Sequence, residues 1–588
     1  MENLEISRVL SQMADLLEIQ DANPFRVRAY RNAARFVDSY ATPMRKLVAE
    51  EADLTELPGI GKDMSSHIME LVETGKLEAL EELTAKVPGT LIDVMELPGV
   101  GPKKAKKLWK ELEVETVDEL EEAAKQGRVA ELAGFGAKSQ QKILAGVEQF
   151  RLHRSRFKIS AADQLVVPLL EYLEGVPEVQ RLEVAGSYRR RQETVGDIDL
   201  LVIARRPGPV MERFTSYPKV ARVEMAGETR GRIALQSGLE VDLRILPRKS
   251  YGAAMVYFTG SKEHNIKLRK RAIERGLRLS EYGVFRQDDP DDESGEETER
   301  DPWAGEMIAG KEEKQVYRAL DLPWIAPELR EDRGEVEAAA AGELPELIQL
   351  EDMRGDLQMH STWSDGKNSI EEMLEGCVAK GYEYFAMTDH SKALAMTGGL
   401  DAKRLRQQWK EIAEIQERHP EIRILRGQEV DILADGSLDL EDEMLEELDL
   451  VVISVHSRFD LPVAEQTKRV IAAIQHPQVD ILAHPTGRLI NRRPPFDLAL
   501  DEVLQCAREN HVIVELNAHP ERLDLKDTHL MLARELGLQV VISTDAHRVQ
   551  HLDLMSYGVE QARRAWLTKG DVVNTLPLAG LIEILEKN

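Results

Sequence analysis

Three aspartates have the spacing of a divalent-metal site. Asp197 and Asp199 occur in the segment GDIDLLVIA, and Asp242 occurs in LEVDLRIL. Side chains at positions i and i+2 leave the same face of a strand, so the first two carboxylates would lie together. Carboxylates held this close repel each other unless a hard cation such as Mg²⁺ lies between them. Pairing of the two strands would bring Asp242 to the same place.

The segment VAGSYRRRQETVGD, which precedes the first two aspartates, could bind a polyphosphate. Gly186 and Ser187 are followed by Arg189 and Arg190, which offer hydrogen-bond donors. A DxD pair alone is typical of surface turns. The combination of GS, two arginines, GDID and a later strand aspartate is the pattern of the nucleotidyltransferase superfamily and favours nucleotide chemistry.

Histidines are concentrated in the last two-fifths of the chain. Of 14 histidines, 11 follow residue 350. In MTDH (387–390), ISVHS (453–457), LAHPTG (482–487) and STDAH (543–547), an apolar run ends in a histidine or a carboxylate. Parallel α/β barrels build their sites at the carboxyl ends of their strands. Lone histidines are usually core or surface residues, but this repetition predicts a metal centre.

Two near-identical glycine turns occur in the first 150 residues. They are LPGIG (57–61) and LPGVG (97–101), and LAGFG (132–136) is a weaker third copy. The prolines and glycines predict tight turns that lead into helices. Backbone N–H groups at a helix start favour an anion such as a phosphate diester. One copy could be an ordinary connection, but the repeat resembles the helix–hairpin–helix motif of DNA repair proteins.

Length and composition indicate a soluble protein of several domains. The chain has 588 residues, of which 42% are hydrophobic and 31% charged. No apolar run reaches the roughly 20 residues of a membrane span, and the N-terminus lacks the pattern of a signal peptide. Only Cys377 and Cys506 are present, which excludes a disulfide framework. We therefore expect a cytoplasmic protein with no membrane partner.

The net charge of −28 is unevenly distributed along the chain. Residues 1–286 carry a net charge of +2, residues 287–350 carry −14, and residues 351–588 carry −16. Basic faces can therefore exist in the N-terminal half. Residues 287–301 form an acidic stretch that is typical of a solvated loop.

Hydrophobic patterning divides the chain into four parts. Residues 1–150 show helical periodicity, residues 158–250 are rich in strands, and residues 251–286 are helical and basic. A segment rich in Glu, Ala and Gly near 331–346 indicates a linker. After residue 350, short strands alternate with helices, which predicts parallel α/β architecture and is compatible with a barrel.

The segment YFTGSKEHNIKLRKRAIERG (257–276), together with the glycine turns and the three aspartates, resembles the family X (polymerase β-like) DNA polymerases over residues 1–320. The resemblance implies an all-α helix–hairpin–helix part, with a lyase-like domain at 1–85 and a fingers-like domain at 86–155. It also implies an α+β nucleotidyltransferase palm at 156–250, a helical thumb at 251–325 and a linker at 326–349.

The same resemblance implies roles for individual residues. Asp197 and Asp199 would bind Mg²⁺ or Mn²⁺, and Asp242 would also activate the primer 3′ hydroxyl. The implied nucleotide contacts are Gly186, Ser187, Arg190, Gly196, Tyr257, Phe258, Gly260, Asn265 and Arg269, although plain core packing stays open for the two aromatic residues. The implied DNA contacts are Arg26, Tyr30, Gly59, Gly61, Gly99, Gly101 and Lys103.

One family feature is missing from the first glycine turn. Family members with 5′-deoxyribose-phosphate lyase activity have a Schiff-base lysine on the following helix, and the corresponding residue here is His67. Lys62 is close in sequence but lies on a different face of the helix. Because the lyase reaction needs an amine nucleophile, we do not expect lyase activity.

Residues 350–588 resemble the PHP (polymerase and histidinol phosphatase) phosphoesterase domain, which is a distorted, TIM-like α/β barrel. The resemblance implies up to three Mn²⁺ or Zn²⁺ ions, which generate hydroxide and hold a phosphodiester. The implied ligands are Gln358, His360, Glu429 and Asp545 for one ion, Glu429, His456 and His484 for a second, and Asp365, His390 and His547 for a third.

Gln358 departs from the family pattern, which usually has His-x-His in the first motif. Here the motif is Gln358-Met359-His360. A neutral amide oxygen in place of an imidazole should weaken Zn²⁺ binding and favour a harder ion such as Mn²⁺.

These resemblances imply a DNA polymerase that fills short gaps from dNTPs and a PHP 3′→5′ exonuclease, with abasic-site cleavage or 3′-phosphate removal as further activities. We expect gapped or primer-template DNA as the substrate, and a monomeric protein. Two alternatives stay open. The chain could be a nucleotidyltransferase for RNA or a small molecule joined to a phosphatase, or a polymerase or DNA-binding protein whose PHP domain is an inactive scaffold.

Overall fold

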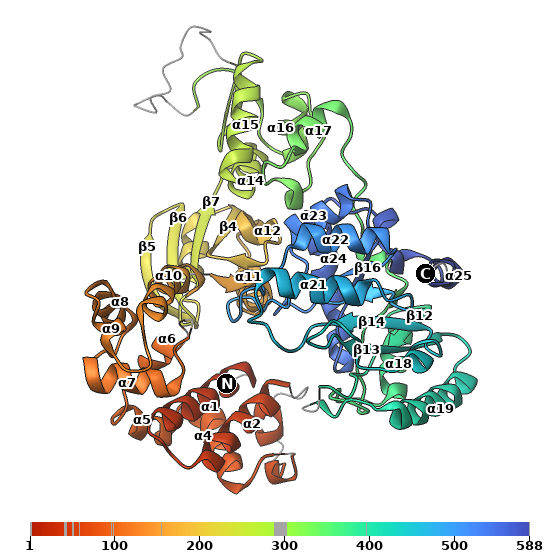
Figure 1. Cartoon of the computed structure of the whole chain (residues 1–588). Helices are drawn as coiled ribbons and strands as arrows, with labels where there is room; N and C mark the ends of the chain where they lie inside the picture. Colours follow the sequence, from red (N-terminus) through yellow and green to blue (C-terminus); the bar gives the residue numbers. More distant parts are fainter. Residues whose placement is uncertain are drawn as a thin grey trace. The chain divides into compact units, whose positions relative to one another are not determined.

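The computed structural model describes residues 3–39, 44–49, 52–57, 59–95, 97, 99–154, 156–286, 303–394 and 397–586 (Figure 1). The chain divides into two compact units, Met1–Ser155 and Arg156–Asn588. The acidic stretch 287–301 lies outside the described residues. Among the helices that the structure describes, none is long and apolar enough to cross a bilayer.

The first unit consists of helices around one apolar core, as the helical periodicity of the sequence predicts. Leu10, Ile68 and Leu108 are fully buried in this core. The helices are α1 (Asn3–Ile19), α2 (Pro24–Ser39), α3 (Met44–Ala49), α4 (Lys62–Thr74), α5 (Glu78–Thr84), α6 (Leu91–Met95), α7 (Pro102–Leu112), α8 (Val117–Lys125), α9 (Arg128–Glu131) and α10 (Ala137–Arg154).

The second unit begins with a five-stranded sheet, called the palm sheet below, of strand order β2-β4-β7-β6-β5. Strands β4 and β7 run parallel, and all other neighbours are antiparallel. Ile198, Leu200 and Val241 are fully buried, as their alternation with polar residues predicts. The elements are β1 (Phe157–Lys158), α11 (Ile159–Glu174), β2 (Val179–Val184), α12 (Gly186–Arg189), β3 (Thr194–Val195), β4 (Asp197–Ala204), α13 (Pro207–Thr215), β5 (Val220–Ala226), β6 (Arg230–Leu235) and β7 (Glu240–Ile245).

Residues 251–325 contain helices and, in addition, a small antiparallel sheet that the sequence analysis did not anticipate. The elements are α14 (Tyr251–Thr259), α15 (Lys262–Ile273), β8 (Leu277–Ser280), β9 (Gly283–Arg286), β10 (Met307–Ala309) and α16 (Glu313–Ala319). Strands β8 and β9 form a hairpin, and β10 pairs with β9. Val284 and Phe285 of β9 are buried, so the hairpin supplies part of the local core.

The segment 326–349, expected as a linker, is not an exposed spacer. It contains a 3₁₀ turn at Pro327–Leu329 and α17 (Glu335–Ala341). Leu329 and Val336 pack in the same apolar core as residues of α14 and α16. Arg330 and Glu335 are fully buried. The Ala- and Glu-rich composition therefore belongs to a short packed helix, because its apolar side chains face the core.

The rest of the chain forms a parallel barrel of seven strands in sequential order. The strands are β11 (Gly355–Asp356), β12 (Tyr384–Met387), β13 (Arg423–Asp431), β14 (Leu450–Ser454), β15 (Ile481–Leu482), β16 (Ile513–Asn517) and β17 (Val540–Ser543). A parallel bridge between Met359 and Ala546, just beyond the first and last strands, nearly closes the barrel. This confirms the predicted TIM-like architecture.

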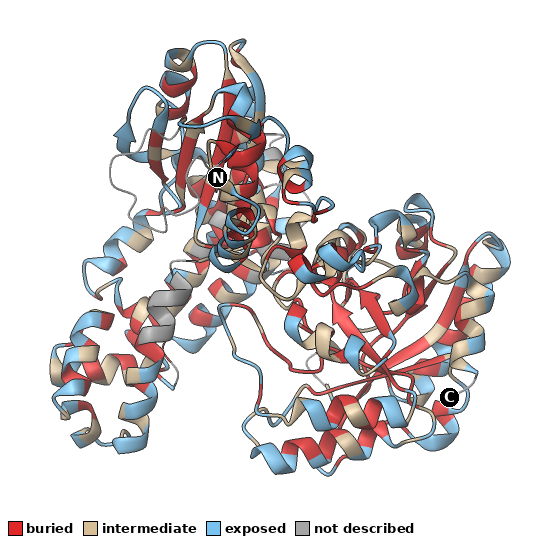
Figure 2. Cartoon of the chain, turned by 90° about the horizontal axis from the view of Figure 1, so that it is seen from above, coloured by how far each residue is buried: buried red, intermediate tan, exposed pale blue. Residues whose placement is uncertain are grey.

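Helices cover the outside of the barrel. They are α18 (Ile370–Ala379), α19 (Ala402–Arg418), α20 (Asp442–Leu445), α21 (Val463–Ile474), α22 (Leu500–Glu509), α23 (Asp527–Glu535), α24 (Met555–Arg564) and α25 (Leu578–Leu585). Figure 2 shows buried strands inside and helices with exposed outer faces. A strand buried on both sides reads as a continuous apolar run, as DLVVIS (449–454) does.

Candidate functional site

Strand pairing in the palm sheet brings the three aspartates together. Strands β4 and β7 are parallel neighbours, and Asp199 lies directly opposite Asp242 in their register. Asp197 is two residues earlier on the same face of β4 and is exposed, whereas Asp242 is only 5% exposed. The predicted pairing is confirmed, and the resulting cluster of carboxylates is open to solvent at the Asp197 end.

The electrostatics of this cluster suit divalent cations. Burial, and then the negative charges of Asp197 and Asp242, raise the pKa of Asp199 to about 7. Arg232 on β6, which the sequence analysis missed, donates from Nε (3.0 Å) and Nη2 (2.7 Å) to Asp242 Oδ2. Asp242 Oδ1 is buried and has no hydrogen-bond partner among the described residues. That oxygen and the crowded Asp199 carboxylate would gain a partner from a bound metal ion.

Gly186 holds the turn that was predicted to bind phosphate against these carboxylates. Its φ is +67°, and a Cβ atom built there would lie 2.8 Å from Asp199 Oδ2. Glycine is needed on both counts. Gly186 and Ser187 open the short helix α12, and Gly196 precedes Asp197 at the start of β4. The predicted Gly and Ser positions therefore lie on segments that border the carboxylate cluster.

Arg190 is held in place by hydrogen bonds on two sides. Its Nε donates to Glu331 Oε1 (2.9 Å), and its Nη1 donates to the carbonyl oxygen of Thr259 (2.8 Å). Neighbouring Arg189 forms a bidentate ion pair with Glu313, with N–O distances of 2.9 and 2.8 Å. The two arginines that look equivalent in sequence therefore differ in their acidic partners.

The predicted sugar- and base-contacting residues surround the end of α14 and the start of α15. Tyr257 and Phe258 pack edge to face, with ring centroids 5.0 Å apart, and both are only partly buried. Asn265 Nδ2 donates to the carbonyl oxygens of Tyr257 (2.7 Å) and Gly260 (3.2 Å). Tyr257, Asn265 and Arg269 line one small pocket. Tyr257 therefore faces a pocket, whereas Phe258 packs against an apolar core cluster.

The glycine turns of the first unit have the predicted geometry. Gly59 and Gly99 have φ values of +77° and +80°. Gly61 and Gly101 are the N-cap residues of α4 and α7. A Cβ at these last two positions would meet no described atom within 4 Å, and their φ is negative. Internal packing does not require glycine there, whereas close approach of a phosphate to the backbone would. Lys103, also predicted, is exposed on the first turn of α7.

Tyr30, predicted as a DNA contact, lies mostly in the core. Its exposed fraction is 1%, and its hydroxyl lies 3.2 Å from His67 Nδ1. The two rings are stacked with centroids 5.7 Å apart. Burial lowers the pKa of His67, so at neutral pH its imidazole is neutral. Arg26 is exposed beside them. Tyr30 therefore supports the fold, and its predicted contact with DNA does not fit this burial.

The barrel brings together the histidines and carboxylates predicted at its strand ends. Glu429 is the centre of the cluster, with its oxygens 3.0 Å from His390 Nδ1, 3.0 Å from His484 Nε2 and 3.5 Å from His456 Nε2. A second part of the cluster contains His360, Asp365, Asp545 and His547, in which His360 Nε2 lies 3.1 Å from Asp545 Oδ1 and His547 Nε2 lies 3.4 Å from Asp365 Oδ1. Two subsets, His360-Asp365-His390-His547 and His390-Glu429-His456, have ligand atoms close enough for one ion each.

Secondary contacts orient two of these imidazoles. His456 Nδ1 lies 3.2 Å from Asp431 Oδ1, and His547 Nδ1 lies 2.7 Å from the carbonyl oxygen of Asp545. Each contact leaves Nε2 facing the cluster, which is typical of metal-binding histidines. Burial opposes the charged form of His547, but the hydrogen bond to Asp365 and the charge of Asp545 raise its pKa to about 9.

Gln358 fits the predicted position but differs from the others in its contacts. It is 1% exposed, and neither of its amide atoms has a hydrogen-bond partner among the described residues. Both nitrogens of His360 and Oε2 of Glu429 are also buried without a hydrogen bond of good geometry. A buried polar group without a partner is costly. Divalent metal ions at the cluster would satisfy all three side chains.

The sequence analysis missed His519 and Asn517, which follow the same strand-end rule at β16. Asn517 Nδ2 donates to Asp545 Oδ2 (3.1 Å). Burial lowers the pKa of His519 to about 4. The apolar residues within HVIVELN (511–517) are typical of a strand, so the end of this run could have indicated both residues.

Family models match four separate parts of the chain. Family models described as helix-hairpin-helix domain, SAM-like helix-hairpin-helix tandem, DNA polymerase beta thumb and PHP domain match residues 1–77, 91–148, 254–331 and 356–519, respectively. The chain is 40% identical over 590 residues to the DNA polymerase/3′-5′ exonuclease PolX of Bacillus subtilis, covering 100% of both chains.

Two further relatives match the chain only in part. A probable phosphatase of Acetivibrio thermocellus is 32% identical over 188 residues, which are 31% of this chain and 73% of that protein. DNA polymerase lambda of Rattus norvegicus is 24% identical over 350 residues, which are 56% of each chain. The full-length similarity, the matched domains and the two clusters lead to one conclusion: the chain belongs to the family X (polymerase β-like) DNA polymerases that carry a C-terminal PHP domain.

Proposed function

We propose that the chain is a DNA polymerase that fills short gaps from dNTPs, and that its barrel is a 3′→5′ exonuclease. The observation that carries the polymerase half is the register of β4 and β7, which places Asp199 opposite Asp242 beside Asp197. A relative that matches from end to end bears both activities in its name, which favours this reading over an RNA or small-molecule nucleotidyltransferase.

In the polymerase half, the chain's own residues would bind the metal ions and orient the triphosphate, and Asp242 would activate the primer hydroxyl by accepting its proton. Asp197, Asp199 and Asp242 would hold two Mg²⁺ or Mn²⁺ ions, which would lower the pKa of the primer hydroxyl and neutralise the leaving pyrophosphate. Arg232 fixes the orientation of Asp242 through Oδ2, which leaves Oδ1 for a metal ion beside the primer hydroxyl. Ser187 and Arg190 would hold the triphosphate, and Tyr257 would pack against the sugar.

In the barrel half, the cluster would position a 3′-terminal phosphodiester. The nine ligand positions would hold up to three ions, which supply a nucleophilic hydroxide and neutralise charge on the phosphate. Arg522 lies 3.8 Å from Asp545 through its Nε and would contact the phosphate from the rim. Because the ligand set is complete apart from the Gln358 replacement, an active site is favoured over an inactive scaffold.

We further propose Mn²⁺ as the preferred ion of the barrel site. The reason is Gln358, whose amide oxygen is a harder ligand than an imidazole nitrogen. Metal titration of exonuclease activity tests this directly. Best activity with Zn²⁺ and none with Mn²⁺ would contradict the assignment.

A second candidate activity at the barrel is removal of a 3′ phosphate. Two relatives that each cover about a third of this chain are named probable phosphatases. A primer that ends in a 3′ phosphate, incubated without dNTPs, separates the two activities. Phosphate release without shortening of the primer would identify the phosphatase.

Reciprocal substitutions test the two-site assignment. Asp197→Ala with Asp199→Ala should abolish dNTP incorporation on gapped DNA and spare primer degradation. His360→Ala with His390→Ala should do the reverse, and each double variant controls for the folding of the other. Equal loss of both activities in either variant would contradict two separate sites.

A further inference from the structure

One buried carboxylate, Glu331, connects the nucleotide-binding turn of the palm to the barrel. Its Oε1 accepts hydrogen bonds from Arg190 Nε, Gln192 Nε2 and Arg564 Nη1, each at 2.9 Å. The side chains of Arg190 and Glu331 are each 10% exposed, and that of Arg564 is 4% exposed. Water competes weakly at such a place, so these charged hydrogen bonds are stronger than surface pairs.

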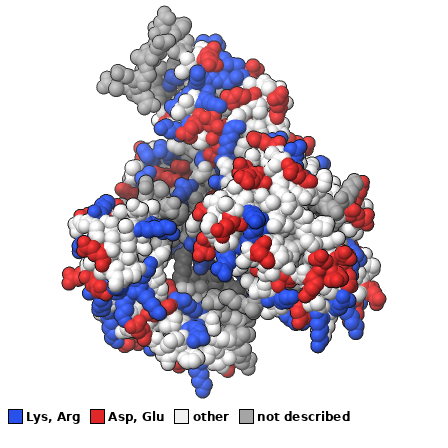
Figure 3. Space-filling model, in the orientation of Figure 1, with Lys and Arg blue, Asp and Glu red and all other residues white. Residues whose placement is uncertain are grey.

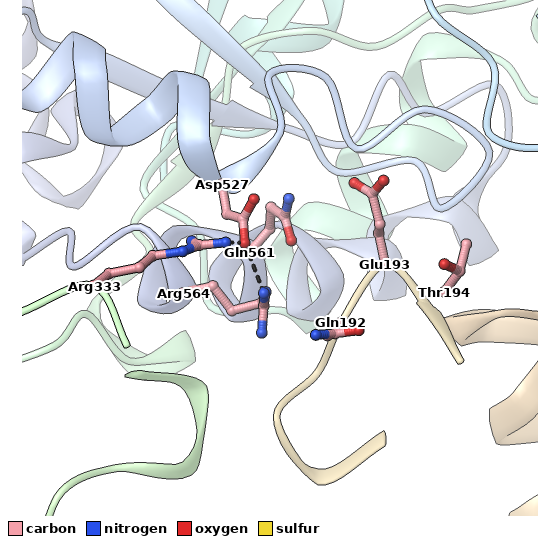
Figure 4. A pocket seen from close by; sticks show the side chains of 7 residues that line it. All are labelled: Gln192, Glu193, Thr194, Arg333, Asp527, Gln561 and Arg564. Atoms are coloured by element: carbon pink, nitrogen blue, oxygen red, sulfur yellow. Dashed lines mark hydrogen bonds and ion pairs between the residues drawn. The ribbon is translucent and has the colours of Figure 1, made fainter. Parts of the chain in front are cut away.

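Arg564 is the last residue of α24 in the barrel, and it binds partners that other contacts also hold in place. Its Nη1 also donates to the carbonyl oxygen of Arg190 (2.7 Å), and its Nη2 donates to Asp527 Oδ2 (2.7 Å). Arg333 Nη1 donates to the same oxygen of Asp527 (2.9 Å). Figure 4 shows Arg333 and Arg564 reaching Asp527 from two sides. Arg564 therefore donates both to the backbone of Arg190 and to the Glu331 carboxylate, which in turn holds the Arg190 side chain.

Two further ion pairs attach the same palm segment to the barrel. Arg191 pairs with Glu560 of α24 (2.7 Å) as well as with Asp163 of the palm (2.9 Å). Glu193 pairs with Arg488 of the barrel (2.7 Å). The segment that follows the Gly186 turn is thus held by the barrel at Arg190, at Arg191 and at Glu193.

A polar cavity of about 190 Å³ adjoins this junction. Gln192, Glu193 and Thr194 line it from the palm side, and Gln561 and Arg564 line it from α24 (Figure 4). Gln561 is 2% exposed, and its amide atoms have no hydrogen-bond partner among the described residues. A cavity of this size and polarity has room for water. Side chains at this junction can therefore change their hydrogen bonds with water as a partner, without exposing an apolar core.

We propose that Glu331 and Arg564 are positioning residues of the polymerase site, through which the barrel holds Arg190 ready for the incoming triphosphate. This inference rests on the proposed polymerase function. Two donors of Arg190 are used by Glu331 and Thr259, which fixes the plane of the guanidinium and leaves its other donors for phosphate oxygens. A guanidinium that is already fixed loses less side-chain entropy when the nucleotide binds.

The test is Arg564→Met, which removes the barrel's contacts with Arg190 and Glu331 without leaving a buried carboxylate unpaired. Asp527 keeps Arg333, and Glu331 keeps Arg190 and Gln192. We expect the KM for dNTP on gapped DNA to rise about tenfold, as for the loss of a hydrogen bond to a charged group. The kcat at saturating dNTP and the exonuclease rate should change much less. Arg564→Lys, which retains the charge, should give an intermediate KM.

Arg563→Met is the matched control on the same helix. Arg563 also forms a partly buried ion pair, to Glu328 at 2.7 Å, and donates to the carbonyl oxygen of Ile348 (2.9 Å). These contacts do not include the Arg190 segment, so the KM for dNTP should equal that of the unaltered protein. An equal KM in the Arg563→Met and Arg564→Met proteins would overturn the inference.

Glu331→Gln provides a second measurement. Because Glu331 and Arg564 would act on Arg190 as one unit, the double variant should raise the KM no more than the larger single effect. If the KM effects of the two single substitutions multiplied in the double variant, the two residues would not position Arg190 as one unit. A protein that incorporates no dNTP before any substitution would instead contradict the proposed function.

Discussion

At Gly186, two independent requirements exclude a side chain. The left-handed φ disfavours every residue with a Cβ, and the space that a Cβ would occupy is taken by the Asp199 carboxylate. A methyl group there must displace either the turn or the carboxylate. The geometry of the turn is therefore coupled directly to an oxygen of the proposed metal site.

Gly186→Ala should lower the rate of dNTP incorporation by on the order of 100-fold, because displacement of a reacting group by about 1 Å has that effect. Gly208→Ala is the control, since a Cβ at Gly208 in α13 would meet no described atom within 4 Å. Single-turnover incorporation measures both. Equal rates in the two variants would show that the turn tolerates the methyl group.

The raised pKa of Asp199 predicts pH-dependent stabilisation by metal ions. Its ordinary value is 3.8 and its value in the folded, metal-free site is about 7, so the folded state binds more protons than the unfolded state between these values. The stability of the metal-free protein therefore falls as pH rises through this window and is level above it. A bound metal ion would offset this loss of stability, because it favours the ionised carboxylate.

Saturating Mg²⁺ should accordingly raise the unfolding temperature more at about pH 8 than at about pH 6. Scanning calorimetry of the unaltered protein and of Asp199→Asn isolates the contribution of this site from that of the barrel. In Asp199→Asn the difference between the two pH values should shrink. A larger metal effect at the lower pH would contradict the assignment.

At the scale of elements, the segment 303–341 is held by charges buried in its packing. Glu313 at the start of α16 binds Arg189 of the palm and Arg330 (2.7 Å), which is fully buried. Burial opposes ionisation of Glu313, but the two arginines lower its pKa to about 2. Its contribution to stability is therefore present above its ordinary pKa of 4.5 and is lost as pH falls towards 2.

Glu313→Gln should destabilise this segment by about 3–5 kcal/mol, because it leaves the Arg330 charge buried and without a carboxylate. Glu312→Gln should change stability by less than about 1 kcal/mol, since Glu312 is half-exposed and pairs with Arg181 at 3.4 Å. Hydrogen exchange of the α14 and α16 amides measures the local effect. Equal exchange in both variants would mean that the buried charges are compensated elsewhere.

At the scale of the whole molecule, a protein of net charge −28 must present DNA with local positive surfaces. In Figure 3, basic and acidic side chains alternate over much of the visible face, and basic atoms gather over the place of α7. Helix α7 has the sequence PKKAKKLWKEL and begins at the Gly101 N-cap. Its lysines and backbone N–H groups would bind phosphates without reading the bases.

Lys103→Ala should weaken binding to gapped DNA of any sequence and reduce the slope of log K against log salt by about 1. Lys125→Ala is the control, because Lys125 on α8 pairs with Glu121 at 2.8 Å on its own helix. Fluorescence anisotropy at several salt concentrations measures both slopes. An unchanged slope for Lys103→Ala would contradict the assignment of α7 to the DNA interface.

Much of the site could be predicted from local sequence patterns, since chemistry there depends on short spacings. The i, i+2 separation of Asp197 and Asp199 places both on one strand face, and each apolar run of the barrel ends where a ligand is needed. The glycine turns likewise specify their own geometry at Gly59 and Gly99. These features are local, so neighbouring residues alone determine them.

Only the tertiary structure decided which charges meet. Nothing near Arg190 in sequence indicates Glu331 or Arg564, which reach it only because the palm packs against the barrel. Arg232 meets Asp242 only through the register of β6 and β7. An Ala- and Glu-rich segment becomes a packed helix because a core is available beside it. Long-range packing of this kind depends on the whole folded chain, and a local spacing rule carries no information about it.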